Sequence, residues 1–259
     1  MRLFVRGYPY RVFGVIPWDR HLFGVDDPET LFLLGTDGYG RDQFSRLLQG
    51  GRISLTTGWL ATILSLLIGT LLGTLSGFYG RWLDDLVMRI GEASLLLPWL
   101  YLLLAARAFL PFDVQPSTRY LMLIAIVGVL GWARPARLLR GLVLSLRERG
   151  YVMAARGFGA SSGYLLRVHI LPDTLVVLIT QAALLIPQYI MAEVTLSFLG
   201  LGVDEPSPSW GNMLAGVQHY HVLVSYWWML LPALAPVVVS ICCLSIGDAL
   251  LQGRRSMPL

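Results

Sequence analysis

Long uncharged stretches dominate the pattern of hydrophobic and polar positions along the chain. The clearest lies between Arg52 and Arg81, where no charged residue interrupts the run ISLTTGWLATILSLLIGTLLGTLSGFYG. Because a bilayer core requires about 20 mostly apolar residues per helix, this run predicts a membrane span. Small residues recur in it at three- and four-residue steps, a spacing that lets membrane helices approach closely. They are Gly58, Ala61, Ser65, Gly69, Gly73, Ser76 and Gly77.

Four further apolar stretches predict four more spans, at about residues 83–110, 118–139, 173–199 and 225–251. We expect Pro98 to kink the first of these. Glu92, Arg107 and Arg134 would then lie near the membrane interfaces, where long side chains reach toward water. The pattern therefore predicts an all-α integral membrane protein with five transmembrane helices.

The composition supports a membrane protein. Hydrophobic residues make up 55% of the 259 residues and charged residues only 14%, with a mean hydropathy of +0.63. A soluble domain carries roughly 25% charged residues, so this chain lacks the polar surface that such a domain needs. All 20 basic residues are arginine. The absence of lysine excludes a phosphate-binding loop of the G-x-x-x-x-G-K-[ST] type and Schiff-base catalysis within this chain.

The arginines gather on one side of the predicted bundle. Those on the richer side are Arg81, Arg89, Arg134, Arg137, Arg140, Arg147, Arg149, Arg156, Arg167, Arg254 and Arg255. Apart from residues 1–52, the other side receives only Arg107 and Arg119. Because arginine-rich loops face the cytoplasm, we predict that the 134–173 loop and the C-terminus are cytoplasmic. The basic charge then reflects membrane topology and not nucleic-acid binding.

With five spans, residues 1–52 must lie outside the cytoplasm. They contain seven arginines, at positions 2, 6, 11, 20, 41, 46 and 52. Long segments translocate largely regardless of charge, but something must initiate their export. We therefore expect an extracytoplasmic segment at residues 1–52, and a further span that precedes it and is missing from this chain.

The 134–173 loop is too basic to span a membrane and predicts a series of short helices. Its pattern indicates an amphipathic helix to about Arg149, a short helix over residues 151–156 and a turn at Gly157 and Gly159. Ser161 or Ser162 is expected to cap the helix that follows. A helix–turn–helix beneath a bundle suits docking into another protein, and an ordinary connector is the simpler alternative.

Residues of this loop resemble the "EAA" signature of permease subunits of binding-protein-dependent ABC importers. The resemblance rests on Ala154-Ala155, Gly159 and Leu171-Pro172, which keep the spacing of the pattern E-A-A-x(3)-G-x(9)-I-x-L-P. Met153 replaces the glutamate of the signature, and His169 occupies its isoleucine position.

Other blocks resemble the dipeptide/oligopeptide/nickel branch of that family, and in particular its second permease subunit. LGTDGYGRD at residues 34–42 and GRISL at residues 51–55 precede or begin the first predicted span. LSFLGLG at residues 196–202 and PSPSWG at residues 206–211 follow the fourth. Family members usually have six spans, the first before the LGTD block, which agrees with the expected upstream span.

The resemblance implies a type I ABC importer-like transmembrane domain over residues 53–255, with a cytoplasmic coupling loop at residues 140–173. It implies a cell-membrane permease subunit that imports di- or oligopeptides, with nickel or another small solute as the alternative cargo. The implied partners are a second permease subunit, two ATPase subunits that hydrolyse the ATP, and an extracytoplasmic solute-binding protein. The residues implied in coupling to the ATPase are Met153, Ala154, Ala155, Arg156, Gly159, Leu171 and Pro172.

A few polar residues are candidates for the translocation path. Glu193 lies in an apolar span, where a carboxylate is costly and suggests function. It is a path candidate together with Trp210, and a packing role is the alternative. The Gly- and Pro-rich residues 200–216 predict either a re-entrant element or a plain loop. No catalytic, cofactor-binding or metal-binding set is predicted, because His219 and His221 lack a third ligand nearby. An ATP-independent secondary transporter is the rival function.

Overall fold

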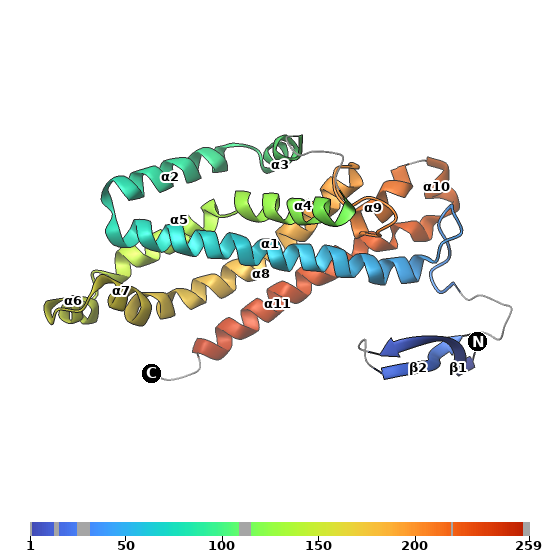
Figure 1. Cartoon of the computed structure of the whole chain (residues 1–259), viewed down its shortest axis with the longest axis horizontal. Helices are drawn as coiled ribbons and strands as arrows, with labels where there is room; N and C mark the ends of the chain where they lie inside the picture. Colours follow the sequence, from blue (N-terminus) through green and yellow to red (C-terminus); the bar gives the residue numbers. More distant parts are fainter. Residues whose placement is uncertain (1, 13–15, 25–31, 109–114, 219, 256–259) are drawn as a thin grey trace. The chain divides into compact units, whose positions relative to one another are not determined.

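The computed structural model describes residues 2–12, 16–24, 32–108, 115–218 and 220–255. It divides into two compact units, Met1–Arg46 and Leu47–Leu259. The first contains a β-hairpin and a turn that leads into the first helix, and the described part of the second consists of helices and their connections (Figure 1).

The first unit contains a β-hairpin, which is an addition to the helical prediction. Strand β1 (Arg2–Val12) pairs antiparallel with β2 (Ile16–Gly24), with Arg2 opposite Gly24 and Val12 opposite Ile16. Aromatic and β-branched residues, which favour strands, are frequent in both segments. The predicted helical fold is confirmed for the second unit.

The LGTD block folds as a tight turn around Asp37. One carboxylate oxygen of Asp37 accepts hydrogen bonds from the backbone N–H groups of Tyr39 and Arg41, both at 2.9 Å, and the other accepts from Arg41 Nε at 2.6 Å. Gly35 and Gly40 have φ values of 69° and 77°, which glycine adopts without steric cost. Burial raises the pKa of Asp37, but these hydrogen bonds together outweigh it and hold the pKa below its ordinary value. The block is therefore a structural entry to the first helix.

Helix α1 (Gln43–Tyr79) is long and apolar enough to cross a membrane. It ends where Gly80 turns the chain with a φ of 64°. Helix α2 (Arg81–Leu96) follows, and α3 (Trp99–Ala108) continues after a bend of 97°. The break falls at Pro98, so the predicted proline kink is confirmed. In the described part of the chain four helices are long enough to span, and this bent pair can count as a fifth.

Helices α4 (Pro116–Leu130) and α5 (Ala133–Leu146) together form one candidate span, which extends to Leu146, past the predicted end at residue 139. Glycines of α1 let α5 approach its backbone. A Cβ at Gly73 would lie 2.5 Å from Ala136 O, and one at Gly77 would lie 2.9 Å from Arg140 O. The predicted role of small residues in close helix packing is confirmed.

Helix α8 (Leu171–Phe198) corresponds to the fourth predicted span and runs through the middle of the helical unit (Figure 1). It contributes Leu185, Tyr189 and Leu196 to a buried cluster with residues of α1, α3 and α4. The elements that precede it are α6 (Gly150–Gly157), α7 (Ser162–Tyr164) and the π-helical turn η1 (Leu165–Ile170). Those that follow it are α9 (Trp210–Ala215), η2 (Gly216–Gln218), α10 (Tyr220–Ser225), η3 (Trp227–Ala233) and α11 (Leu234–Arg255).

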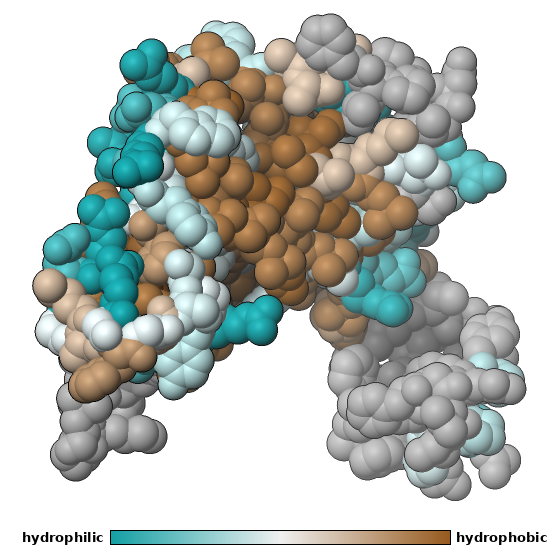
Figure 2. Space-filling model, turned by 60° about the vertical axis from the view of Figure 1, so that its left-hand side comes forward, coloured by the Kyte–Doolittle hydropathy of each residue, from teal (hydrophilic) through white to brown (hydrophobic). Residues whose placement is uncertain are grey.

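Large apolar side chains also cover the outside of the helical unit. On α11, Val237, Val238 and Ile241 are all more than half exposed. Figure 2 shows a broad hydrophobic surface across the middle of this unit, with hydrophilic residues gathered toward one end. Such a surface is expected where lipid or another membrane subunit is the neighbour.

The structure places Arg107 differently from the expectation that it reaches toward water at a membrane interface. Arg107 is only 4% exposed, and its Nε donates a hydrogen bond to Leu201 O at 2.8 Å. Arg134 lies near the middle of the 27-residue span Tyr120–Leu146. The expectation that Arg107 reaches water is wrong, because its side chain binds a carbonyl inside the protein. The interface position of Arg134 stays a prediction.

Candidate functional site

The predicted coupling loop forms a compact segment at residues 147–161, called here the loop segment. Its helix α6 buries Val152 completely, in a hydrophobic cluster with Phe78 of α1 and Ile170 of η1. Val143 and Leu146 of α5 and Leu165 of η1 complete the cluster. One side of α6 is thus fixed to the ends of three other elements.

The turn after α6 has the predicted features. Gly159 has a φ of 85°, a conformation that glycine adopts more readily than other residues. Ser161 Oγ accepts a hydrogen bond from Tyr164 N at 3.3 Å and caps α7, so Ser161 is the predicted capping residue. Phe158, immediately before Gly159, is 94% exposed. The turn therefore presents an aromatic side chain to its surroundings.

Two side-chain contacts join α6 to membrane-spanning helices. The Arg156 guanidinium lies over the Phe78 ring of α1, 5.6 Å from its centroid. The Tyr151 hydroxyl donates a hydrogen bond to Asp173 Oδ2, in the first turn of α8, at 2.9 Å. Burial, followed by this hydrogen bond, raises the pKa of Tyr151 above its ordinary value. A movement of α6 would therefore act on both helices.

The other residues predicted for the coupling loop lie on two neighbouring elements. Met153 and Ala154 are exposed on α6, and Ala155 is half-buried. Leu171 and Pro172 are exposed in the first turn of α8. Beside α6, a groove is lined by residues of α6, the following turn, α7 and η1, namely Ala155, Phe158, Gly159, Ala160, Ser161, Tyr164 and His169.

A second cluster, called here the Glu193 junction, consists of Ser54 of α1, Glu193 and Ser197 of α8, and Ser209. Glu193 is fully buried, and its two carboxyl oxygens accept hydrogen bonds from Ser54 Oγ at 2.6 Å and Ser197 Oγ at 2.7 Å. Ser209 is also fully buried, and its Oγ accepts a hydrogen bond from Asn212 N at 3.2 Å. These serines in turn hold the chain after α8, because Trp210 N donates to Ser54 Oγ at 3.3 Å and Val203 N donates to Ser197 Oγ at 3.0 Å.

Trp210 completes this junction. Its indole is 4% exposed, and Nε1 donates to Leu47 O at 3.1 Å. A Cβ at the adjacent Gly211 would lie 2.4 Å from Val194 O, so α9 touches the backbone of α8. Residues 200–216 are therefore packed on α1 and α8 and are not a plain exposed loop. That Glu193 and Trp210 border the translocation path stays a prediction.

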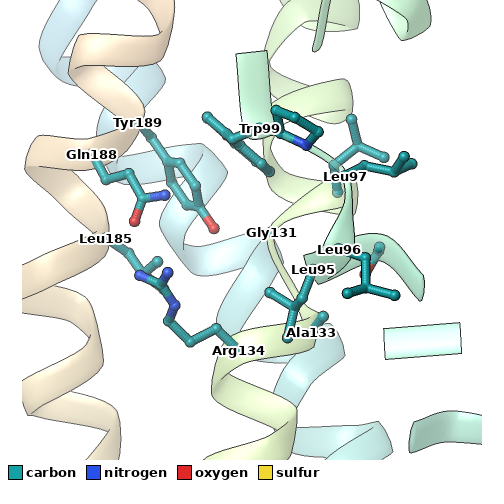
Figure 3. Close-up of a pocket in the computed structure, with 13 residues that line it drawn as sticks. Leu95, Leu96, Leu97, Trp99, Gly131, Ala133, Arg134, Leu185, Gln188 and Tyr189 are labelled. Carbon is teal, nitrogen blue, oxygen red and sulfur yellow. The ribbon is translucent and has the colours of Figure 1, made fainter. Parts of the chain in front are cut away.

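A cavity of about 340 Å³ lies between the break of α2 and α3, the junction of α4 and α5, and α8 (Figure 3). Its polar or aromatic lining residues include Trp99, Arg134, Gln188 and Tyr189. The apolar ones include Leu95, Leu96, Leu97, Leu130 and Leu185. The hydrophobic pattern did not predict this site, although an arginine, a glutamine and a tyrosine within apolar stretches were a signal for it.

The described residues contain no group of three or more His, Cys, Asp or Glu side chains that could hold a metal ion. His219 lies outside the described residues.

Comparison with known families identifies the helical unit. The family described as "binding-protein-dependent transport system inner membrane component" matches residues 69–255. The dipeptide transport system permease protein DppC of Alkalihalophilus pseudofirmus is 38% identical over 226 residues, which cover 87% of this chain and 72% of the relative. The di/tripeptide transport system permease protein DppC of Pseudomonas aeruginosa is 39% identical over 228 residues, with 87% and 72% covered.

Among solved structures, a chain of the MetNI methionine ABC transporter in an inward-facing conformation has a similar fold. The TM-score is 0.62 at 18% sequence identity, and the match covers 81% of this chain and 96% of the other. The helical unit therefore has the fold of a type I importer transmembrane subunit, as predicted.

Proposed function

The chain belongs to the family of binding-protein-dependent transport system inner membrane components, and we propose that it is a permease subunit of an ABC importer that carries small peptides. Relatives at 38% and 39% identity are named as dipeptide and di/tripeptide permeases, which favours peptides over nickel as the cargo. The chain is a multi-pass membrane protein of a transport system and has no catalytic role of its own in this proposal.

The loop segment is the proposed docking site for an ATPase subunit. One observation carries this assignment: α6 buries Val152 against helices of the bundle while its other side and the following turn expose Met153 and Phe158. Exposed apolar side chains on a polar segment are typical of a surface that a partner covers. Ala154, Ala155, Arg156 and Gly159 complete the proposed contact, with Leu171 and Pro172 of α8 beside it.

The ATP is hydrolysed by a partner in this proposal. The chain has no lysine and therefore cannot form the lysine-containing loop that holds ATP phosphates in P-loop ATPases. ATP-driven movement of the docked subunit would reach α1 through Arg156 and Phe78, and α8 through Tyr151 and Asp173. The bundle would then alternate between its inward- and outward-facing states.

The proposed arrangement places the loop segment and the C-terminus in the cytoplasm, in agreement with the arginine distribution. A second permease subunit would cover part of the exposed apolar surface of the helical unit. An extracytoplasmic binding protein would deliver the peptide on the opposite side. The wall of the path near that side would include the segment held by Glu193 and Trp210.

Replacing Gly159 tests the coupling role. Gly159→Val places a β-branched residue at a φ of 85°, and we expect peptide uptake by the assembled transporter to fall at least tenfold. Phe158→Ala removes the exposed side chain and is expected to weaken ATPase binding without affecting the stability of the bundle. The matched control is Gly163→Val, at a position with ordinary φ where an added Cβ meets nothing within 4 Å.

The measurements are uptake of a labelled dipeptide by vesicles and copurification of the ATPase. Unchanged uptake in both Gly159→Val and Phe158→Ala would refute the coupling role. Uptake of nickel but not of dipeptides by the unmodified transporter would refute the proposed cargo.

A further inference from the structure

The cavity beside Arg134 lies among the helices of the candidate membrane spans. Arg134 belongs to the candidate span Tyr120–Leu146, and Ser65 and Tyr189, which meet beside the cavity, lie well inside α1 and α8. An arginine among apolar helices is costly and is found where it faces a cavity or a partner. We propose that the cavity binds the C-terminal carboxylate of the peptide during its passage, a proposal that rests on the proposed function.

The interruption between helices α2 and α3 supports a binding role for the cavity. The 97° bend between α2 and α3 places residues 94–99 along the cavity wall. Non-helical backbone at membrane depth is tolerated where it lines a cavity, and interrupted helices form the binding sites of many transporters. The bend is therefore at the position expected for a substrate site.

The polar groups of the cavity are hydrogen-bond donors suited to an anion. Figure 3 shows the Arg134 side chain reaching from α5 toward Gln188 and Leu185 of α8. Trp99 Nε1 is buried and has no hydrogen-bond partner among the described residues. None of the described residues that line the cavity is acidic. A carboxylate would satisfy the indole N–H and pair with the guanidinium, which binds carboxylates with two parallel hydrogen bonds.

The rest of the lining suits the apolar part of a small peptide. Trp99 and Tyr189 face each other with ring centroids 6.2 Å apart and an interplanar angle of 27°. The Tyr189 hydroxyl is fixed by a 2.8 Å hydrogen bond to Ser65 Oγ. A Cβ at Gly131 would lie only 1.8 Å from that hydroxyl, so glycine preserves this wall. The volume of about 340 Å³ is within the range of pockets for small organic molecules.

The charge of the cavity argues against nickel or another cation, because the lining supplies a guanidinium and no carboxylate. A peptide terminus is the carboxylate that the proposed function brings to this cavity.

The experiment compares a peptide with its amide on the complete transporter. Equilibrium dialysis against the assembled complex in lipid nanodiscs, without the binding protein, measures the binding of labelled dialanine and of dialanine amide. We expect dialanine to bind at least tenfold more tightly than the amide, since a charge-assisted hydrogen bond is worth about a factor of ten or more. Arg134→Gln should reduce this ratio to near one, and Arg134→Lys should retain part of it.

The matched control is Arg137→Gln, which removes an exposed arginine from the same helix outside the cavity and should preserve the ratio. Trp99→Phe keeps an aromatic wall but removes the N–H, and should weaken dialanine binding severalfold more than amide binding. If the Arg134→Gln chain does not assemble into the transporter, the peptide-to-amide ratios of Arg134→Lys and Trp99→Phe test the proposal instead.

Two outcomes overturn the inference: no detectable dialanine binding to the unmodified complex, or a peptide-to-amide ratio that Arg134→Gln leaves unchanged. The proposed function is tested separately, by ATP-dependent uptake of dialanine with the binding protein present. Uptake with an unchanged ratio refutes only the cavity assignment, whereas failure of uptake in the unmodified transporter refutes the function.

Discussion

The Glu193 junction and the loop segment lie near opposite ends of α8 and differ in how their polar and apolar groups are satisfied. At the junction Glu193, Ser54 and Ser209 have no exposed surface, and the carboxyl group has two hydroxyl partners from the same chain, Ser54 and Ser197. In the loop segment, Phe158 is 94% exposed and Met153 57% exposed. The junction is thus complete within this subunit, whereas the loop segment leaves apolar surface for another.

This difference separates a structural role from a docking role. A buried carboxyl group is stable only when hydrogen bonds replace its hydration, and the serines supply them. Exposed apolar side chains have no such compensation until a partner covers them. Because α8 extends between both regions, a movement of the loop segment would act on a helix whose other end is held by the hydrogen bonds of the Glu193 junction.

Removing the carboxyl group of Glu193 tests the junction most strongly. Glu193→Ala leaves two buried hydroxyl groups without their acceptor and opens a void, and we expect a loss of about 3 kcal/mol in unfolding free energy. Glu193→Gln keeps one acceptor oxygen and should lose about 1 kcal/mol. Unfolding in detergent micelles measures both.

The control for this change is Glu148→Ala in the loop segment. The Glu148 side chain is 69% exposed and forms a surface ion pair with Arg147 at 3.1 Å, so its removal should cost less than about 0.5 kcal/mol. Equal stabilities of the Glu148 and Glu193 variants would abolish the contrast between the two regions.

A matched pair of glycines gives the next largest effect. Gly211→Ala adds a Cβ that would lie 2.4 Å from Val194 O and 2.6 Å from Ser197 Cβ, so α9 must move away from α8 at a cost of about 2 kcal/mol. Gly163→Ala adds the same atom in α7, where nothing lies within 4 Å, and should leave stability unchanged or slightly increased. Thermal unfolding of the two variants gives the comparison directly, and a similar midpoint for both would contradict it.

The sequence predicted features that depend on local pattern. Apolar length identified the spans, proline at position 98 identified the break, and Gly159 and Ser161 identified the turn and cap of the loop segment. Each of these features depends on residues within a few positions of one another, so the pattern alone contains the necessary information.

Features that depend on distant partners were not predictable in this way. The attachment of α5 to α2 depends on Arg140 and Asp84, which pair at distances of 2.5 and 2.6 Å although they are 56 residues apart in the chain. Glu193 was recognised as unusual, but its acceptor role depends on Ser54, 139 residues away. The cavity joins Trp99, Arg134 and Gln188 from three separate segments.

The smallest expected effect concerns how α6 is attached to α8. The raised pKa of Tyr151 means that the folded state favours the protonated phenol, which donates to Asp173. Its contribution to stability is therefore complete below the ordinary tyrosine pKa of about 10 and is lost as the pH rises through the higher pKa of the folded state. Because Tyr151 is 44% exposed, the contribution should be below about 1 kcal/mol.

Comparing the wild-type chain with Tyr151→Phe between pH 8 and pH 11.5 isolates this hydrogen bond. The unfolding midpoints should differ at pH 8 and converge above pH 10, because only the wild-type chain has a phenol to lose its proton. Midpoints that stay equally separated over the whole range would show that the hydrogen bond to Asp173 does not stabilise the position of α6. If the midpoints differ only slightly at pH 8 and converge above pH 10, the hydrogen bond contributes little. Burial of Val152 would then be the main interaction that holds the loop segment in place.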